Sequence, residues 1–188
     1  MSVPTCNSVA LPTCTLSLPK GAELSTVAIE ALVFQGIKSL NRLASCRSEG
    51  PELSAAIRQL RDAIRLVSEP SRNWTPKDQL RLVHQFSSWI PSISFGDISK
   101  QNSIVLAILA HFFAVPLVLE LVYYYMLTPV SLPLISSIRT KGISEIDILL
   151  RRKEWIYCEG CGAGHDYYEL MAFPLNTLHL FQYYTDIR

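Results

Sequence analysis

The sequence predicts an all-α protein, an irregular bundle of about six to eight helices with a long, kinked central apolar helix. Apolar residues recur at spacings of three and four along most of the chain, and strand-like alternation is not sustained anywhere. Hydrophobic residues make up 49% of the 188 residues and charged residues 18%, so a sizeable core can form. From residue 102 to residue 127 the ionisable side chains, tyrosines aside, are His111 and Glu120 alone, so this stretch must be buried.

The pattern divides the chain into three segments. Residues 1–22 are proline-containing and lack basic residues ahead of their apolar ones, which predicts an extended or disordered lead-in rather than a secretory signal. Residues 23–157 carry most of the helical periodicity and form the main domain. Residues 158–188 are expected to form a glycine-rich turn and a short helical segment.

Three amphipathic helices are predicted ahead of the apolar stretch. Their ranges are 23–44, 51–67 and 75–90. The third is expected to end before Pro91, because proline disfavours helical geometry in the residue that precedes it. We expect Phe86 and Trp89 of this helix to pack against the first half of the apolar helix.

Four shorter helices are predicted after the apolar stretch. Their ranges are 133–140, 145–155, 166–172 and 175–184. Gly142 is expected to end the first of them and Ser144 to cap the second. Pro174 is expected to separate the last two, because proline removes a backbone hydrogen bond from a helix interior.

Residues 104–127 are long enough to span a bilayer, which takes roughly 20 apolar residues. An ionised Glu120 would cost about 3 kcal/mol in lipid, and basic residues do not flank the stretch closely. We therefore favour a core helix, and the alternative is a small integral membrane protein that spans with residues 104–127. Pro116 is expected to kink the helix in either case.

The metal-like constellation in the chain is Cys158, Cys161 and His165 after the main domain. Two cysteines at this spacing can grip zinc, but a structural zinc site usually takes four ligands and the sequence offers no second pair. We expect no metal and no cofactor. The five cysteines are an odd number, which favours reduced intracellular thiols over a disulfide scaffold.

His111 is expected to be a buried core residue with a hydrogen-bonded ring nitrogen. The sequence has neither a nucleophile elbow nor a phosphate-binding glycine loop after a strand. We expect no catalytic residues and no enzymatic activity. The remaining alternative is an enzyme whose catalytic groups meet only in the folded chain. A net charge of +1 without a basic block argues against direct nucleic-acid binding.

A Trp-Pro-like helix end precedes an apolar helix that contains an Ala-His pair. The residues that carry this pattern are Trp89, Pro91, Val105, Ile108, Leu109, Ala110 and His111. The pattern continues with an aromatic stretch at 123–126, a following helix at 134–138 and a later tryptophan, Trp155. Over roughly residues 55–157 the chain resembles the C-terminal regulatory region of fungal zinc-binuclear-cluster transcription factors, above all the sterol-uptake regulators.

This resemblance implies a non-enzymatic regulatory domain that acts in the nucleus on RNA polymerase II transcription, through protein partners or self-association. Two features depart from the family. Cys6 and Cys14 do not supply the family's DNA-binding cysteine cluster, and tyrosines replace its tryptophans after the histidine helix. We therefore expect a regulatory domain alone, a fragment or a truncated relative, without its own DNA-binding motif.

The resemblance also implies a candidate pocket for an apolar small ligand, because some family members bind such ligands. Its residues are Leu117, Leu121, Tyr124 and Met126. A kink at Pro116 would open space beside the helix, and the tyrosine hydroxyl would orient a sterol hydroxyl. The alternative is a filled core at these positions, because protein interiors are close-packed.

Overall fold

The computed structural model describes residues 26–45, 51–67, 103–127, 133–152, 156–157, 164–165 and 167–186. These residues form five helices and one short antiparallel strand pair, which confirms the all-α class. The helices are α1 (Thr26–Ser45), α2 (Pro51–Val67), α4 (Ser103–Leu127), α5 (Pro133–Arg152) and α6 (Tyr167–Asp186). The strands are β1 (Ile156–Tyr157) and β2 (Gly164–His165).

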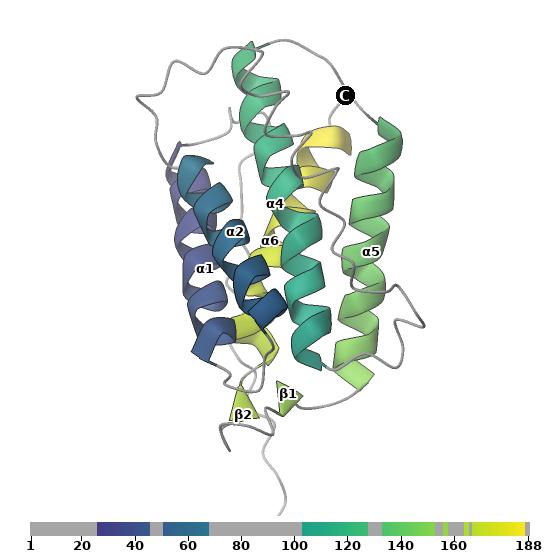
Figure 1. Cartoon of the computed structure of the whole chain (residues 1–188). Coiled ribbons are helices and arrows are strands. Elements are labelled where there is room, and N and C mark those ends of the chain that lie inside the picture. Colours follow the sequence, from purple (N-terminus) through teal and green to yellow (C-terminus); the bar gives the residue numbers. More distant parts are fainter. Residues whose placement is uncertain are drawn as a thin grey trace, which may run out of the picture.

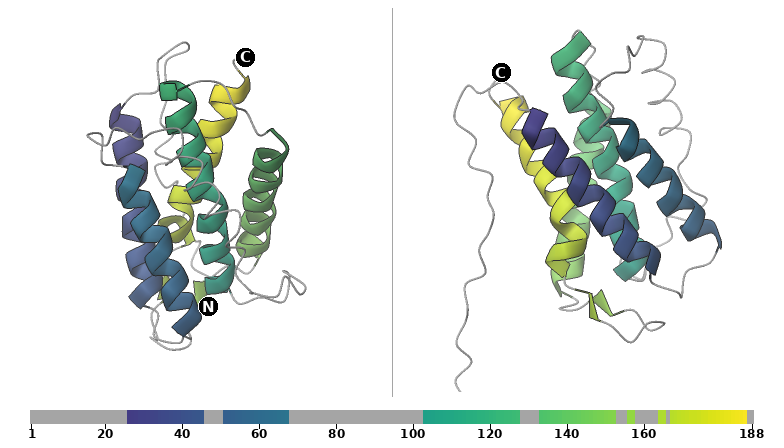
Figure 2. Two further views of the ribbon diagram at one scale, coloured as in Figure 1. Left: turned by 45° about the horizontal axis from the view of Figure 1, so that its top comes forward. Right: turned by 90° about the vertical axis from the view of Figure 1, so that its left-hand side faces the viewer.

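Helix α4 lies at the centre of the bundle, between α1 and α2 on one side and α5 on the other, with α6 behind it (Figure 1). It contacts each of the other four helices, and the two further views show the same arrangement (Figure 2). By length and composition it is the one described helix that could cross a membrane, from Ser103 to Val122. Protein covers 83% of the apolar window that meets this criterion.

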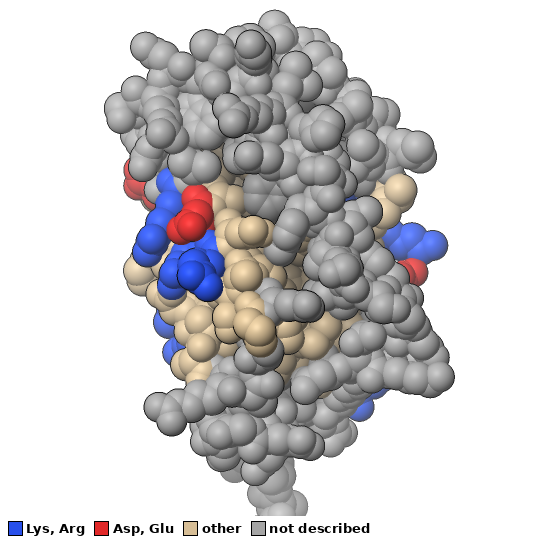
Figure 3. Space-filling model, in the orientation of Figure 1, with Lys and Arg blue, Asp and Glu red and all other residues tan. Residues whose placement is uncertain are grey.

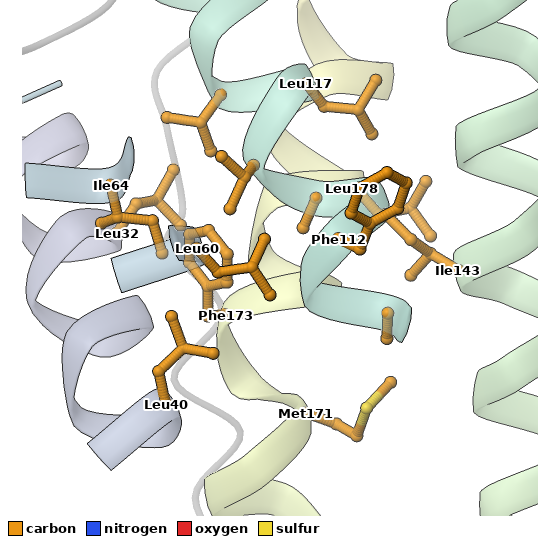
Figure 4. Close-up of a cluster of buried hydrophobic side chains, with 14 of the residues drawn as sticks. Leu32, Leu40, Leu60, Ile64, Phe112, Leu117, Ile143, Met171, Phe173 and Leu178 are labelled. Carbon is orange, nitrogen blue, oxygen red and sulfur yellow. The ribbon is translucent and has the colours of Figure 1, made fainter. Parts of the chain in front are cut away.

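The core is continuous from one side of the bundle to the other, and every helix contributes to it (Figure 4). Labelled members are Leu32 and Leu40 of α1, Leu60 and Ile64 of α2, Phe112 and Leu117 of α4, Ile143 of α5, and Met171, Phe173 and Leu178 of α6. Burial of one such side chain stabilises the fold by about 1.5–3 kcal/mol. Helix α6, from the predicted segment 158–188, packs against α1 and α4 of the predicted main domain.

Helix α5 runs without a break from Pro133 to Arg152, so the predicted helix end at Gly142 and new start at Ser144 are wrong. Gly142 makes room for an aromatic ring instead: a Cβ atom there would lie 2.7 Å from Cε2 of Phe113 on α4. The Ser144 hydroxyl does not cap a new helix, because it donates to the Thr140 carbonyl oxygen at 3.0 Å within the same one.

Helix α6 is also a single helix, so the predicted separation at Pro174 is wrong. Pro174 cannot donate the backbone hydrogen bond that a helix interior expects. The side chains around it bury enough apolar surface to offset this loss, since Leu170 and Phe173 are each 0% exposed. Tertiary packing therefore overrides the local preference of proline.

Several sequence predictions are not tested by the described residues. Helix α4 is α-helical through Pro116, and a kink there remains a prediction. The lead-in 1–22 and the helix 75–90, with Phe86 and Trp89, lie outside the described residues, so the total of six to eight helices also remains a prediction. The strand pair Ile156–His165 and Tyr157–Gly164 was not predicted, because two residues per strand are too few to show an alternating pattern.

Gly36 of α1 faces side chains of both α2 and α6. A Cβ atom on Gly36 would lie 2.8 Å from Cδ1 of Ile64 on α2 and 3.1 Å from Cδ2 of Phe173 on α6. Both neighbours are almost fully buried, so neither has free space to move into. The missing side chain at position 36 therefore sets how closely these helices pack.

We predict that Gly36→Ala lowers the free energy of unfolding by about 1–3 kcal/mol, the usual cost of overpacking a core. This loss would exceed the gain of about 1 kcal/mol in helix propensity. Denaturant unfolding of the purified protein measures it. Ile64→Val removes the Cδ1 atom that the new methyl group meets, so the double variant should lose less than the sum of the two single variants. Strictly additive losses would contradict a steric contact at Gly36.

Candidate functional site

His111, the one histidine in the described part of the core, lies where α1, α4 and α6 meet. Its side chain is 0% exposed, so the prediction that it is buried is confirmed. The Nε2 atom lies 2.6 Å from the Ser39 hydroxyl of α1, and Nδ1 lies 2.7 Å from the Ala107 carbonyl oxygen one helical turn back. The ring stacks on Phe173 of α6, with centroids 5.5 Å apart. His111 thus joins three helices through one side chain.

The partners of His111 determine where its protons sit. The Ala107 carbonyl oxygen can only accept, so Nδ1 carries a hydrogen and donates it. In the neutral ring Nε2 is then an acceptor, and the Ser39 hydroxyl donates to it. The Ser39 hydroxyl also lies 3.1 Å from the Gly36 carbonyl oxygen, but its single hydrogen serves one acceptor at a time.

The proton count is different when His111 is charged. Nε2 would then donate to Ser39, and the Ser39 hydroxyl would be free to donate to the Gly36 carbonyl oxygen. Burial acts against this charged form more strongly than the hydrogen bonds favour it. Burial lowers the pKa of His111 from 6.5 to about 4, and the hydrogen bond to Ala107 only partly opposes the shift. His111 is therefore neutral at pH 7.

A serine hydroxyl beside a histidine nitrogen is also the pairing used in nucleophilic catalysis. Here Ser39 is 1% exposed and His111 is 0% exposed, so a substrate cannot reach either group in this conformation. The third position, which a carboxylate often fills in catalytic triads, is taken by the backbone carbonyl of Ala107. The pair therefore orients and ties helices together, which is a structural role.

Two polar contacts reinforce the α1–α6 interface beside His111. Asn176 Nδ2 of α6 donates to Gln35 Oε1 of α1 at 2.8 Å. The guanidinium of Arg42 on α1 forms an ion pair with the Glu169 carboxylate at the start of α6. Polar contacts of this kind add little net stability where they are exposed to solvent.

Glu120, the one acidic residue of α4, lies near the positive charge of Arg139 on α5. Burial lowers the pKa of the Arg139 guanidinium, and the negative charge of Glu120 acts in the opposite direction. Both side chains are half-buried. The single carboxylate on the central helix therefore has a cation on the facing helix.

The four candidate pocket residues fall in the second half of α4. Leu117 and Leu121 are 0% and 3% exposed and belong to the continuous core. The side chains of Tyr124 and Met126 lie outside the described part of the structure. A ligand pocket at these four residues remains a prediction.

The candidate metal ligands are only partly within the described residues. His165 contributes its backbone to β2, whereas Cys158 and Cys161 lie outside the described residues. Within the described residues, no three side chains of the metal-binding types are grouped together. The expected absence of metal at the Cys158–Cys161 turn remains a prediction.

The partner of His111 was not identified from the sequence. Ser39 lies on the inward face of α1, three residues after Gly36 and beside the buried Leu40. A polar residue on an otherwise apolar face calls for a buried hydrogen-bond partner, and this is the signal that the sequence offered. The sequence could not show that this partner stands 72 positions away.

Comparison with known proteins adds no family assignment, because no protein-family profile, curated protein or solved structure matches the chain.

The lowered pKa of His111 predicts a stability loss in acid. The unfolded chain binds this proton near pH 6.5, whereas the folded protein binds it only near pH 4. The contribution to stability is therefore complete above pH 6.5 and is lost as the pH falls toward 4. The shift corresponds to about 3 kcal/mol, and denaturant unfolding across this pH range measures it.

His111→Leu should lower the free energy of unfolding by about 1–3 kcal/mol at pH 7. The same substitution should flatten the pH dependence of this free energy between pH 6.5 and pH 4. Carboxylates that titrate in the same range are common to both proteins, so they cancel in the difference. His179→Leu on the exposed face of α6 is the matched control and should keep the acid-labile profile. A His111→Leu variant with the parent pH profile would contradict the buried neutral imidazole.

The Glu120–Arg139 pair predicts a measurable coupling between α4 and α5. Arg139→Met should lower stability because it leaves the Glu120 carboxylate half-buried without its neighbouring cation. Glu120→Gln in the same background should recover part of the loss, with a coupling of about 1 kcal/mol in a double-mutant cycle. Additive effects at low salt would show that the two charges do not interact.

Proposed function

We propose that this chain is a non-enzymatic interaction domain. The observation that carries the proposal is the contrast between its closed core and its outer faces. The serine–histidine pair is sealed inside the bundle, whereas five large apolar side chains remain exposed on outer faces of three helices. They are Val27 and Phe34 on α1, Ile138 and Ile148 on α5, and Tyr168 on α6. Aromatic side chains such as those of Phe34 and Tyr168 are enriched in protein interfaces.

We also propose that the interactions serve transcriptional regulation in the nucleus. The support is the resemblance of the Trp89–His111 region to fungal transcription-factor regulatory regions, together with the buried, helical setting of Ala110 and His111. At both edges of the face drawn in Figure 3, described acidic side chains lie beside basic ones, and the net charge of the chain is +1. The proposed partners are therefore proteins rather than nucleic acid.

A tethering experiment tests the regulatory proposal. The full chain, fused to a heterologous DNA-binding domain, should change the output of an RNA polymerase II reporter several-fold. Ile138→Ser combined with Ile148→Ser removes apolar area from the outer face of α5 without entering the core, and should reduce the effect if that face recruits a partner. An unchanged reporter at confirmed nuclear expression would contradict the proposal.

The membrane-spanning alternative rests on the length and composition of α4 alone. Against it stand the cover that the other helices provide and the half-buried Glu120 beside Arg139. Carbonate extraction of cells that express the full chain separates the two cases. An interaction domain is released into the supernatant, and retention in the membrane pellet would overturn the core-helix assignment.

A further inference from the structure

The outward face of α1 carries an exposed stripe of five residues. They are Val27, Glu30, Phe34, Lys38 and Asn41, which follow one another at spacings of three and four. Val27 is 72% exposed and Phe34 is 68% exposed. The right-hand view of Figure 2 shows α1 on the near side of the bundle, and the exposure of all five residues places the stripe on the outer side of this helix. The stripe therefore presents an aromatic side chain to the outside of the bundle.

The charges of the stripe are arranged symmetrically about Phe34. Glu30 lies four residues before Phe34, and Lys38 lies four residues after it. Eight residues correspond to about 12 Å along a helix, which is too far for Glu30 and Lys38 of one chain to pair with each other. A different situation holds on α5, where the exposed Lys141 and Glu145 are four residues apart and already form an ion pair at 3.8 Å.

We infer that the α1 stripe docks against the same stripe of a second copy of this chain, in antiparallel orientation. A two-fold axis beside Phe34 would bring the two phenyl rings together. The same axis would place Glu30 of each copy opposite Lys38 of the other, so that both ion pairs form at once. The row 30–34–38 is also an i, i+4 ridge, the kind of ridge that most often packs between helices.

The inferred self-pairing rests on the proposed function as an interaction domain. It identifies one partner of that domain, a second copy of the same chain. One helix face is a small contact, so the dimer should be weak and concentration-dependent. The orientation follows from the charges, because a parallel pairing in register would place Glu30 against Glu30 and Lys38 against Lys38. Like charges in those positions would oppose association.

Sedimentation equilibrium of the full chain, from about 10 µM to about 1 mM at low salt, tests the inference. A reversible monomer–dimer equilibrium is expected. Phe34→Ala should weaken it by at least about tenfold, because each substitution occurs twice in a symmetric dimer. Circular dichroism should be unchanged, since the side chain lies outside the core.

Charge reversal tests the antiparallel register. Glu30→Lys alone and Lys38→Glu alone should each weaken the dimer by about tenfold, because each places like charges opposite one another twice. The double variant Glu30→Lys/Lys38→Glu restores opposite charges across the axis and should recover the parent affinity. Lys141→Glu/Glu145→Lys on α5 is the matched control and should leave association unchanged.

A protein that remains monomeric throughout the concentration range overturns the self-pairing. So does a dimer that is indifferent to Phe34→Ala, or one whose association the double charge reversal does not restore. These results are distinct from a failure of the proposed function. A monomeric chain that still changes the reporter refutes self-pairing alone, whereas a dimer without effect on the reporter refutes the regulatory role alone.

Discussion

The structure depends on one constraint: α4 is apolar around its whole circumference and must be covered on every side. An amphipathic helix needs one neighbour, but a helix without a polar face needs several. The bundle meets this requirement by placing α1, α2, α5 and α6 around α4, each with an apolar stripe turned inward. The two polar residues within the helix also have partners in the bundle: His111 is hydrogen-bonded inside the core, and Glu120 lies near the positive charge of Arg139.

Close packing against side chains of α4 and α6 also explains the positions of two glycines. Gly36 and Gly142 are both inside helices, where glycine is intrinsically unfavourable. Each is opposite a phenylalanine ring, Phe173 for Gly36 and Phe113 for Gly142, that a methyl group would strike. The helices lose intrinsic propensity at these points and gain closer packing of aromatic groups against the backbone.

The helical class and the helices α1 and α2 were predictable from a local period of apolar residues. Helix α4 and the burial of His111 were predictable because residues 102–127 contain almost no ionisable side chains. The helix ends predicted at Gly142 and Pro174 were wrong because contacts with distant residues outweighed the local sequence signals. The Ser39–His111 contact was beyond prediction, because a single sequence contains no signal that pairs residues 72 positions apart. The strand pair was not predictable, because two residues per strand are too few to show an alternation of apolar and polar residues.

The order of the helices has a consequence for synthesis on the ribosome. Helix α4 ends at Leu127, whereas α6 ends only at Asp186. Helix α6 covers one face of α4 and forms a hydrogen bond to α1 between residues 141 positions apart in the sequence. At about 5–20 residues per second, α4 is complete for several seconds before its last cover exists. During that interval a nascent chain displays an apolar helix of membrane-spanning length to chaperones and targeting factors. The speed with which α6 closes the bundle therefore bears on the yield of folded protein.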